Sequence, residues 1–235
     1  MPHTNETSHA RILANFETLT ISSEAFEGYA PPRLELKPAQ MRASLKMARG
    51  LVLGCQQDDW AHGQAVQERE MAYQPLDPLL TRALAVLRSS AAEFDERAAA
   101  VIGSIHGHRA VPVESAAAGS IGGWAHVSAP NRSFDARLGD FAQLLPILAS
   151  SSGYDPADED LKFSALQAYH EILAVKNSAE FATRVKLAQS RARRDASLDG
   201  LAELAADTKA YVLSRYGSGS SEYRSISGLE FRRPQ

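Results

Sequence analysis

The chain has 235 residues, of which 44% are hydrophobic, so it is long enough to build one large or two small domains around a real core. Its 25 basic and 28 acidic residues give a net charge of −3, which excludes attraction to nucleic acid or to an anionic membrane by the overall field alone. The single cysteine excludes an internal disulfide. Residues 1–15 are polar and lack the apolar core of a secretory signal, and no run of about 20 apolar residues occurs. We therefore expect a cytoplasmic protein with no membrane partner.

Residues 1–36 are predicted to form an N-terminal arm ahead of a helical bundle. The arm contains Phe16, Phe26 and Tyr29 among other large apolar residues, which is more than a freely disordered segment carries. Two placements remain open, because the arm can pack on its own bundle or on a neighbouring subunit. The three aromatic residues are therefore candidates for an interaction surface.

Residues 37–107 are predicted to form a first helical hairpin. Apolar side chains follow steps of four and three residues between positions 41 and 55, and again between positions 77 and 106, which is typical of helices with one apolar face. The first helix is expected to kink or break between Gly54 and Gly63, because glycine weakens a helix. The second is expected to be a single unbroken helix.

The segment 108–132 is rich in Gly, Ala, Ser and Pro and is predicted to be a loop. The segment 133–216 returns to helix and is predicted to form the second part of the bundle. It should contain a helix capped by Asp158 and a last helix that ends at Gly217. The tail 217–235 is expected to pack back onto the bundle.

The helix that follows Asp158 carries two parallel apolar rows. The longer row has the four-three stepping of a core-facing stripe, and the shorter row widens the apolar face. We expect both rows to face the core. The longer row consists of Leu161, Ala165, Ala168, Ile172, Val175, Ala179 and Ala182, and the shorter row consists of Leu166, Tyr169 and Leu173.

Two turns of the chain use the same residues at the same spacing. Tyr73-x-Pro-x-Asp77 and Tyr154-x-Pro-x-Asp158 each follow one helix and open the next. This match is typical of two related helical hairpins, and it is equally typical of independent turns that share one capping chemistry.

The chain contains no His-Glu-x-x-His, no paired Cys-x-x-Cys and no P-loop, so we expect no metal and no cofactor and assign no catalytic residue. His106 and His108 lack a nearby third ligand. Cys55 lies in an apolar helical row, as core cysteines do.

Two further sets of residues are candidates for contact with a partner or ligand. Arg184, Arg191 and Arg194 belong to the densest basic run, which suits an acidic partner, yet no aromatic residue interleaves and nucleic acid is not expected. A small ligand would require polar groups that converge only in three dimensions. The candidate polar cluster consists of Tyr154, Tyr169, His170, Tyr211 and Tyr223, and the tyrosines near the carboxyl terminus also suit packing of the tail on the bundle.

The carboxy-terminal part of the chain resembles a family of uncharacterised bacterial all-helical proteins. The resemblance covers most of the chain after about Tyr73, and its most specific part is the closing signature Lys-Ala-Tyr-Val, Tyr-Gly, Ser-Glu-Tyr and Leu-Glu-Phe between positions 209 and 231. It implies a helical fold. It implies no activity, ligand or site residue.

The sequence thus predicts an all-α fold, an antiparallel bundle of about five long helices. Long apolar rows and an apolar arm favour a structural or protein–protein interaction role with self-association, in which the partner is a second copy or another protein. The alternative is a small-ligand binder or an enzyme whose site is assembled only in three dimensions.

Overall fold

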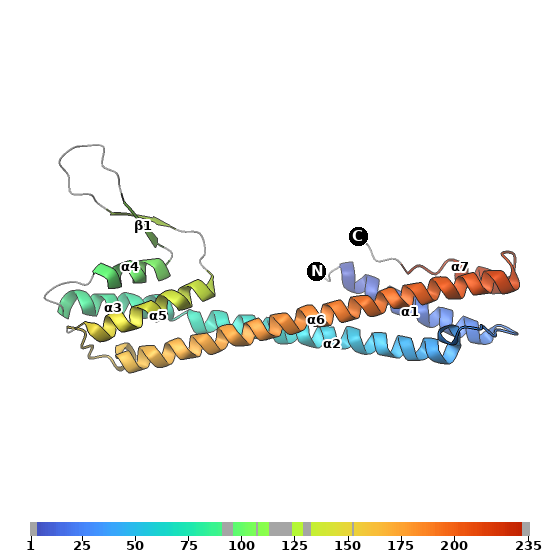
Figure 1. Cartoon of the computed structure of the whole chain (residues 1–235), viewed down its shortest axis with the longest axis horizontal. Coiled ribbons are helices and arrows are strands. Elements are labelled where there is room, and N and C mark those ends of the chain that lie inside the picture. The colour runs from blue at the N-terminus through green and yellow to red at the C-terminus, as the bar shows by residue number, and fades with distance from the viewer. Residues whose placement is uncertain are drawn as a thin grey trace. The chain divides into compact units, whose positions relative to one another are not determined.

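The computed structural model describes residues 4–90, 96–106, 108–112, 124–128, 133–151 and 153–231. It is a helical bundle, which confirms the predicted all-α class (Figure 1). An antiparallel hairpin of two short strands lies within the segment that was predicted to be a loop. The elements in chain order are α1 (Thr4–Ala25), the 3-10 helix η1 (Leu34–Leu36), α2 (Pro38–Tyr73), α3 (Leu76–Ser90), α4 (Glu96–Ile105), β1 (His108–Pro112), β2 (Trp124–Ser128), α5 (Phe134–Ser150), the 3-10 helix η2 (Glu159–Leu161), α6 (Phe163–Tyr216) and α7 (Ser221–Ser227).

The chain divides into two compact units. Unit 1 consists of Met1–Ala61 and Arg184–Gln235, and unit 2 consists of His62–Thr183. Helices α2 and α6 run antiparallel and each contributes to both units. Unit 1 therefore contains α1, α7, the first part of α2 and the last part of α6, whereas unit 2 contains α3, α4, α5 and the remaining parts of the two long helices.

The N-terminal segment is a helix of the unit 1 core. Ile12, Phe16 and Leu19 of α1 are at most 1% exposed and pack with apolar side chains of α2, α6 and α7. The buried hydroxyl of Thr20 donates to the Phe16 carbonyl, and that of Ser23 donates to the Leu19 carbonyl, so neither polar group is left unpaired. Of the two placements considered for this segment, the structure has the one on its own bundle.

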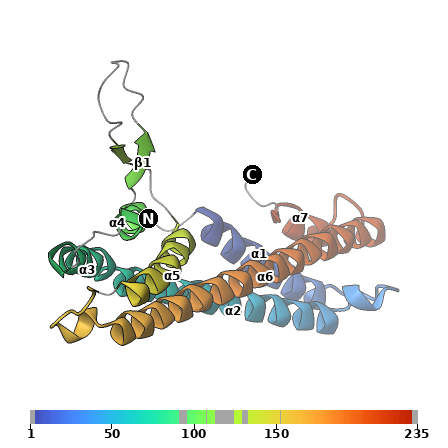
Figure 2. The same ribbon diagram turned by 60° about the vertical axis from the view of Figure 1, so that its left-hand side comes forward.

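Two predicted helix boundaries are wrong. Helix α2 continues through Gly54 and Gly63 without a break, because side chains of α6 pair with it along this stretch, as Lys186 does with Asp58 at 2.9 Å. The stripe between positions 77 and 106 is divided between α3 and α4, which pack against each other as one straight helix cannot. Residues 91–95, which connect the two helices, lie outside the described part of the chain. Helix α4 also packs against α5, as both views show (Figures 1 and 2).

Helix α6 is one helix of 54 residues, in place of the two that the sequence predicted. It begins after η2, and Asp158 makes no side-chain cap; its carboxylate accepts instead from Arg82 at 2.7 Å. The predicted stop is confirmed, since α6 ends at Tyr216 and Gly217 has a φ of +89°, a left-handed conformation that glycine adopts without strain.

The turn before each long helix is built in the same way. The Tyr29 hydroxyl donates to the Leu36 carbonyl at 2.9 Å, and the Tyr154 hydroxyl donates to the Leu161 carbonyl at 2.6 Å. A 3-10 helix ends at each of these leucines. The two turns lie 125 residues apart, and the shared residues are Gly28, Tyr29, Pro31, Leu36 and Lys37 in the first and Gly153, Tyr154, Pro156, Leu161 and Lys162 in the second.

The same offset of 125 residues relates buried positions throughout the two units. Five such pairs, with every member at most 2% exposed, are Phe16 and Phe141, Leu19 and Leu144, Met41 and Leu166, Leu76 and Leu201, and Leu87 and Val212. An exposed ion pair also recurs with its charges exchanged: Arg33 contacts Asp207 at 2.6 Å in unit 1, and Asp158 contacts Arg82 at 2.7 Å in unit 2.

The chain therefore contains an internal repeat. In this repeat α1 corresponds to α5, η1 corresponds to η2, and α2 and α3 together correspond to α6. The sequence match between Tyr73 and Tyr154 placed the repeat in the wrong register, because the Tyr73 hydroxyl makes a different contact and donates to the Phe134 carbonyl at 3.1 Å. The position of unit 1 that corresponds to Tyr154 is Tyr29.

Candidate interaction surface

Helix α6 has apolar residues on two of its sides in unit 2, and only one of them faces the core. The shorter of the two predicted rows is the buried one: Leu166 and Leu173 are fully buried, and the Tyr169 hydroxyl donates to the Ala72 carbonyl of α2 at 2.6 Å. The longer row was predicted to be buried too. This prediction is confirmed for Leu161, which is 1% exposed, but it is wrong from Ala168 onward. Ile172 is 51% exposed and Val175 is 65% exposed.

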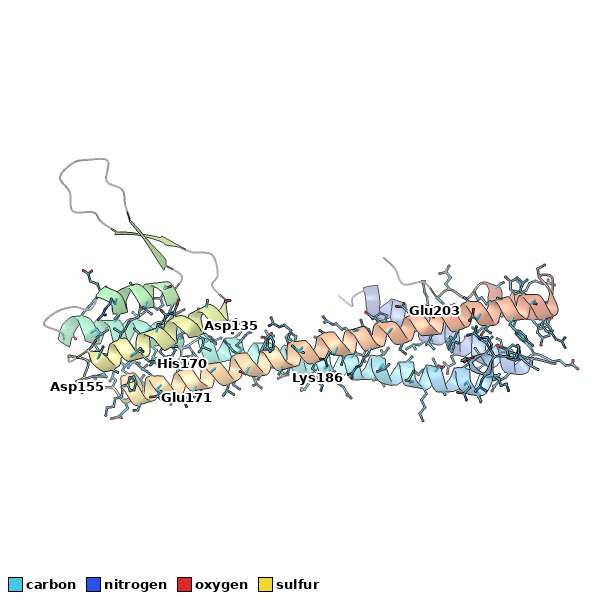
Figure 3. All side chains as sticks on the ribbon, in the orientation of Figure 1. Asp135, Asp155, His170, Glu171, Lys186 and Glu203 are labelled. Atoms are coloured by element: carbon cyan, nitrogen blue, oxygen red, sulfur yellow. The ribbon has the colours of Figure 1, made fainter. Side chains whose placement is uncertain are left out.

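We call this exposed set the α6 outer row; it consists of Ala168, Ile172, Val175, Ala179 and Ala182, all exposed and spaced by four and three residues. Single exposed apolar residues are common on protein surfaces, but a stepped row of them along one helix is the pattern that packs against another helix. The charged residue beside the row is Glu171, which Figure 3 labels next to His170 on α6. Glu171 forms no ion pair with any residue in the described part of the chain.

Unit 1 presents an exposed row at the equivalent positions of α2. We call it the α2 outer row; it consists of Ala43, Met47, Gly50 and Gly54, which lie 125 residues before Ala168, Ile172, Val175 and Ala179. Met47 is 61% exposed, Ala43 and Gly50 are also exposed, and Gly54 is half-buried. Lys46 lies beside this row where Glu171 lies beside the other, so the two equivalent positions carry opposite charges.

A buried polar network holds the opposite, inner side of α6 in unit 2. Arg69 of α2 contacts Glu180 of α6 at 2.7 Å, with side chains 17% and 6% exposed, and the Arg69 guanidinium lies 4.4 Å from the centre of the Phe134 ring. Asn177 donates to Asp135 of α5 at 2.9 Å. Removing one partner of a buried pair of this kind costs much free energy. The contacts of this network join α6 to α2 and α5 on the side of α6 away from the α6 outer row.

The three aromatic candidates of the N-terminal segment pack within unit 1. Phe16 is fully buried, so it belongs to the core and its prediction as an interaction residue is wrong. Phe26 and Tyr29 are half-buried against the same core, where Phe26 packs edge-on against Tyr216 and Tyr29 against Tyr211. Packing within unit 1 thus explains why these positions carry aromatic side chains.

Arginines of the basic run form contacts within unit 1. Arg191 pairs with Asp59 at 2.7 Å, and Arg194 pairs with Asp195 at 2.9 Å and donates to the Cys55 sulfur at 3.4 Å. Arg184 also interacts within the chain. Asp59 and Asp195 therefore pair with Arg191 and Arg194 within unit 1, and the Arg191 side chain is still 55% exposed. A basic interaction surface at these positions stays a prediction.

The predicted polar cluster is not one cluster. Tyr154, Tyr169 and His170 belong to unit 2, whereas Tyr211 and Tyr223 belong to unit 1. Burial raises the pKa of Tyr154 and of Tyr169 to about 12, so both phenols stay protonated and act as hydrogen-bond donors to backbone carbonyls.

The other three members pack within their own units. The His170 ring lies edge-on to the Phe141 ring, with the two ring centres 5.5 Å apart. Tyr211 and Tyr223 pack against the unit 1 core. Tyr223 thereby ties the first part of the predicted tail to unit 1, while residues 232–235 of that tail lie outside the described part of the chain.

Within the described residues, no three metal-ligating side chains come together, and no helix is both long and apolar enough to cross a membrane. Comparison with known proteins adds no identification. No family model matches the chain, no curated protein matches it, and no solved structure matches it. Other large apolar side chains of the described surface are exposed as well, among them Leu53, Trp60 and Phe181. The α6 outer row and its counterpart on α2 differ from these in that they are rows of several residues at equivalent positions of the repeat.

Proposed function

We propose that this protein is an interaction protein that self-associates through the α6 outer row. The observation that carries the proposal is the exposure of Ile172 and Val175 on a helix whose opposite side is already fixed by a core. Complete burial of an Ile or Val side chain is worth about 1.5–3 kcal/mol, so covering this row with a second apolar helix face is a strong driving force for association.

The composition around the row supports a helix-on-helix contact. Ala168, Ala179 and Ala182 are small and allow a neighbouring helix to approach closely, while Ile172 and Val175 project between them as knobs. Among the exposed residues of α6 from Phe163 to Ala182, only Glu171 is acidic or basic. Centres of protein interfaces are depleted of charge in the same way.

The proposal is tested by placing a charge in the middle of the row. Val175→Glu should convert an oligomer into a monomer, because a carboxylate at the centre of an apolar contact loses its water without gaining a partner. The measurement is light scattering on the size-exclusion eluate over a range of protein concentrations. The matched control is Gln143→Glu, which puts the same charge on an exposed position of α5 in the same unit and should leave the mass unchanged.

Circular dichroism must show equal helix content for both variants, since Val175 is exposed and its replacement should not disturb the core. A wild-type chain that remains monomeric at every concentration contradicts the proposal. So does a Val175→Glu variant whose oligomeric mass equals that of the wild type. Either result favours the alternative function, that of a small-ligand binder.

A further inference from the structure

We infer that the α6 outer row of one copy packs against the α2 outer row of a second copy, so that the contact joins two different surfaces of the same chain. This inference rests on the proposed function and names the partner surface. An antiparallel contact of two identical α6 rows would bring Glu171 toward Glu171 of the partner subunit, and like charges at an apolar interface are unfavourable. A contact between the two different rows brings Glu171 toward a lysine instead.

Charge complementarity is specific to Lys46 and Glu171. Neither residue forms an ion pair in the described part of the chain. Neighbouring charged residues on the same helices do, since Arg42 pairs with Glu24, Arg49 with Glu17 at 2.7 Å, and Lys176 with Glu68 at 2.8 Å. Lys46 and Glu171 are thus the charged residues beside the two rows that form no ion pair in the described part of the chain. They carry opposite charges at equivalent positions of the repeat.

The orientation of the contact follows from the repeat. Two equivalent helix faces that pack antiparallel, as if related by a twofold axis perpendicular to both helices, turn the same flank toward each other. Lys46 and Glu171 lie on the same flank of equivalent rows. The antiparallel arrangement therefore places them side by side, whereas a parallel arrangement places each of them on the opposite edge of the contact.

Shape supports the same pairing. In the antiparallel register that places Lys46 beside Glu171, Ala43 lies opposite Val175, Met47 opposite Ile172 and Gly50 opposite Ala168. The small residues Ala43, Gly50 and Gly54 let the two helices approach closely. A Cβ added to either glycine would meet no atom within 4 Å, so the packing of the chain itself does not require glycine there. Each glycine in a helix costs about 1 kcal/mol relative to alanine, and close approach of a second helix gives that cost a reason.

The surface beside the α2 row widens the contact. A groove between α1 and α2 is lined by Ile21, Arg42, Lys46 and Arg49 among others, and Ile21 is 57% exposed. The groove therefore borders the row on the side of Lys46 with a further apolar side chain. Met47 adds a flexible side chain that adapts to a partner.

A contact between unlike surfaces has a consequence for assembly. After two copies bind, one still exposes its α2 row and the other its α6 row, so further copies can add. Such a contact gives a ring if its rotation closes and an open filament if it does not. A contact between identical surfaces stops at a dimer. The mass of the assembly therefore carries information about the kind of contact.

The decisive experiment uses one damaged surface per chain. Met47→Glu blocks the α2 row and Val175→Glu blocks the α6 row, and each variant should be monomeric alone in light scattering. An equimolar mixture should form a 1:1 complex that grows no further, because one intact surface remains on each chain. The controls are Ala14→Glu and Gln143→Glu, at exposed positions of α1 and α5, which should assemble as the wild type does.

The possible results separate this inference from the proposed function. If Met47→Glu associates as the wild type does while Val175→Glu is monomeric, two α6 rows pair with each other, the inference falls and the proposed function stands. If the wild type itself is monomeric, both fall. Monomeric single variants whose mixture also stays monomeric overturn the inference.

A second pair of variants tests the charges. Lys46→Glu and Glu171→Lys should each raise the dissociation constant about tenfold, because each creates a like-charge contact. The mixture of the two variants should recover wild-type affinity, since every contact in it joins opposite charges. An unchanged affinity for Lys46→Glu would show that Lys46 does not lie at the contact.

Discussion

Unit 1 and unit 2 bury side chains at equivalent positions but differ in the chemistry of those side chains. At one contact between α2 and α6, unit 2 has the ion pair of Arg69 and Glu180, whereas unit 1 has Arg194 and the Cys55 sulfur. Both units have the arginine, but its partner is a carboxylate in unit 2 and a thiol in unit 1. Two further positions differ in the same sense: Asn177 and Asp135 of unit 2 correspond to Val52 and Ala10 of unit 1.

The comparison separates what the fold requires from what each unit adds. Both units have a large buried apolar side chain from α1 or α5 and a tyrosine turn before the long helix. The buried polar network is an addition of unit 2. It makes the position of α6 in that unit more specific, at the cost of removing charges from water.

The largest expected effect tests whether the equivalent core positions are equally important. Phe16→Ala and Phe141→Ala should each lower the free energy of unfolding by about 3–5 kcal/mol, because each removes a fully buried ring and leaves a cavity. Urea denaturation followed by circular dichroism measures both. Leu213→Ala, at a residue 40% exposed, is the control and should cost far less.

Equal losses for the two phenylalanines would sharpen the equivalence of the units. A loss confined to one of them would break it, and would mean that the two cores contribute unequally despite the same burial.

The next effect tests the difference between the units. Glu180→Ala should lower the free energy of unfolding by about 3 kcal/mol, because it leaves the mostly buried Arg69 without its carboxylate. Cys55→Ala at the equivalent position should cost only about 1 kcal/mol, since a thiol is a small apolar group. Denaturant unfolding of the two variants gives the ratio. Similar costs would show that the polar network adds nothing to the packing.

The sequence predicted the helices well, since a four-three row identifies a helix without reference to its surroundings. It also predicted the end of α6 at Gly217, because a left-handed terminator is a local property. It could not predict which row of α6 faces the core. Both rows have the helical period, and the choice depends on α2 and α5, which cover one side only.

The repeat is readable in the sequence of the two tyrosine turns. The shared pattern of glycine, tyrosine, proline, leucine and lysine in the two turns is longer than the match between Tyr73 and Tyr154. Recognition of that pattern would have paired Tyr29 with Tyr154 and so placed the N-terminal segment within the bundle. The exchange of charge between Lys46 and Glu171 would then have been visible from the sequence, but their exposure would not.

A smaller effect tests the two tyrosine turns. Tyr29→Phe and Tyr154→Phe should each lower the free energy of unfolding by about 1 kcal/mol, because each removes one hydrogen bond to a backbone carbonyl. Equal losses would support the equivalence of the turns. Thermal unfolding at neutral pH measures both, with the exposed Thr18→Val as a control whose hydroxyl bonds only within its own helix.

The same turns carry a pH dependence. Burial raises the pKa of Tyr154 to about 12 from an ordinary value of 10.0, so the folded state disfavours the phenolate. The stability from this group is complete below pH 10 and is lost as the pH rises toward 12. Tyr154→Phe should unfold with a smaller loss of stability between pH 10 and 12 than the wild type. An identical loss in both proteins would assign it to other groups.

The smallest expected effect concerns the ion pairs whose charges are exchanged between the units. Arg33 with Asp207 and Arg82 with Asp158 are exposed, so water screens them and their removal should change the melting temperature very little. The informative variants are exchanges: Arg33→Asp together with Asp207→Arg gives unit 1 the polarity of unit 2. If the position matters and the sign does not, the double variant should melt at the wild-type temperature while each single variant, with two like charges, melts lower. A double variant that melts as low as the single variants would mean that the sign at this position is fixed by surroundings that differ between the units.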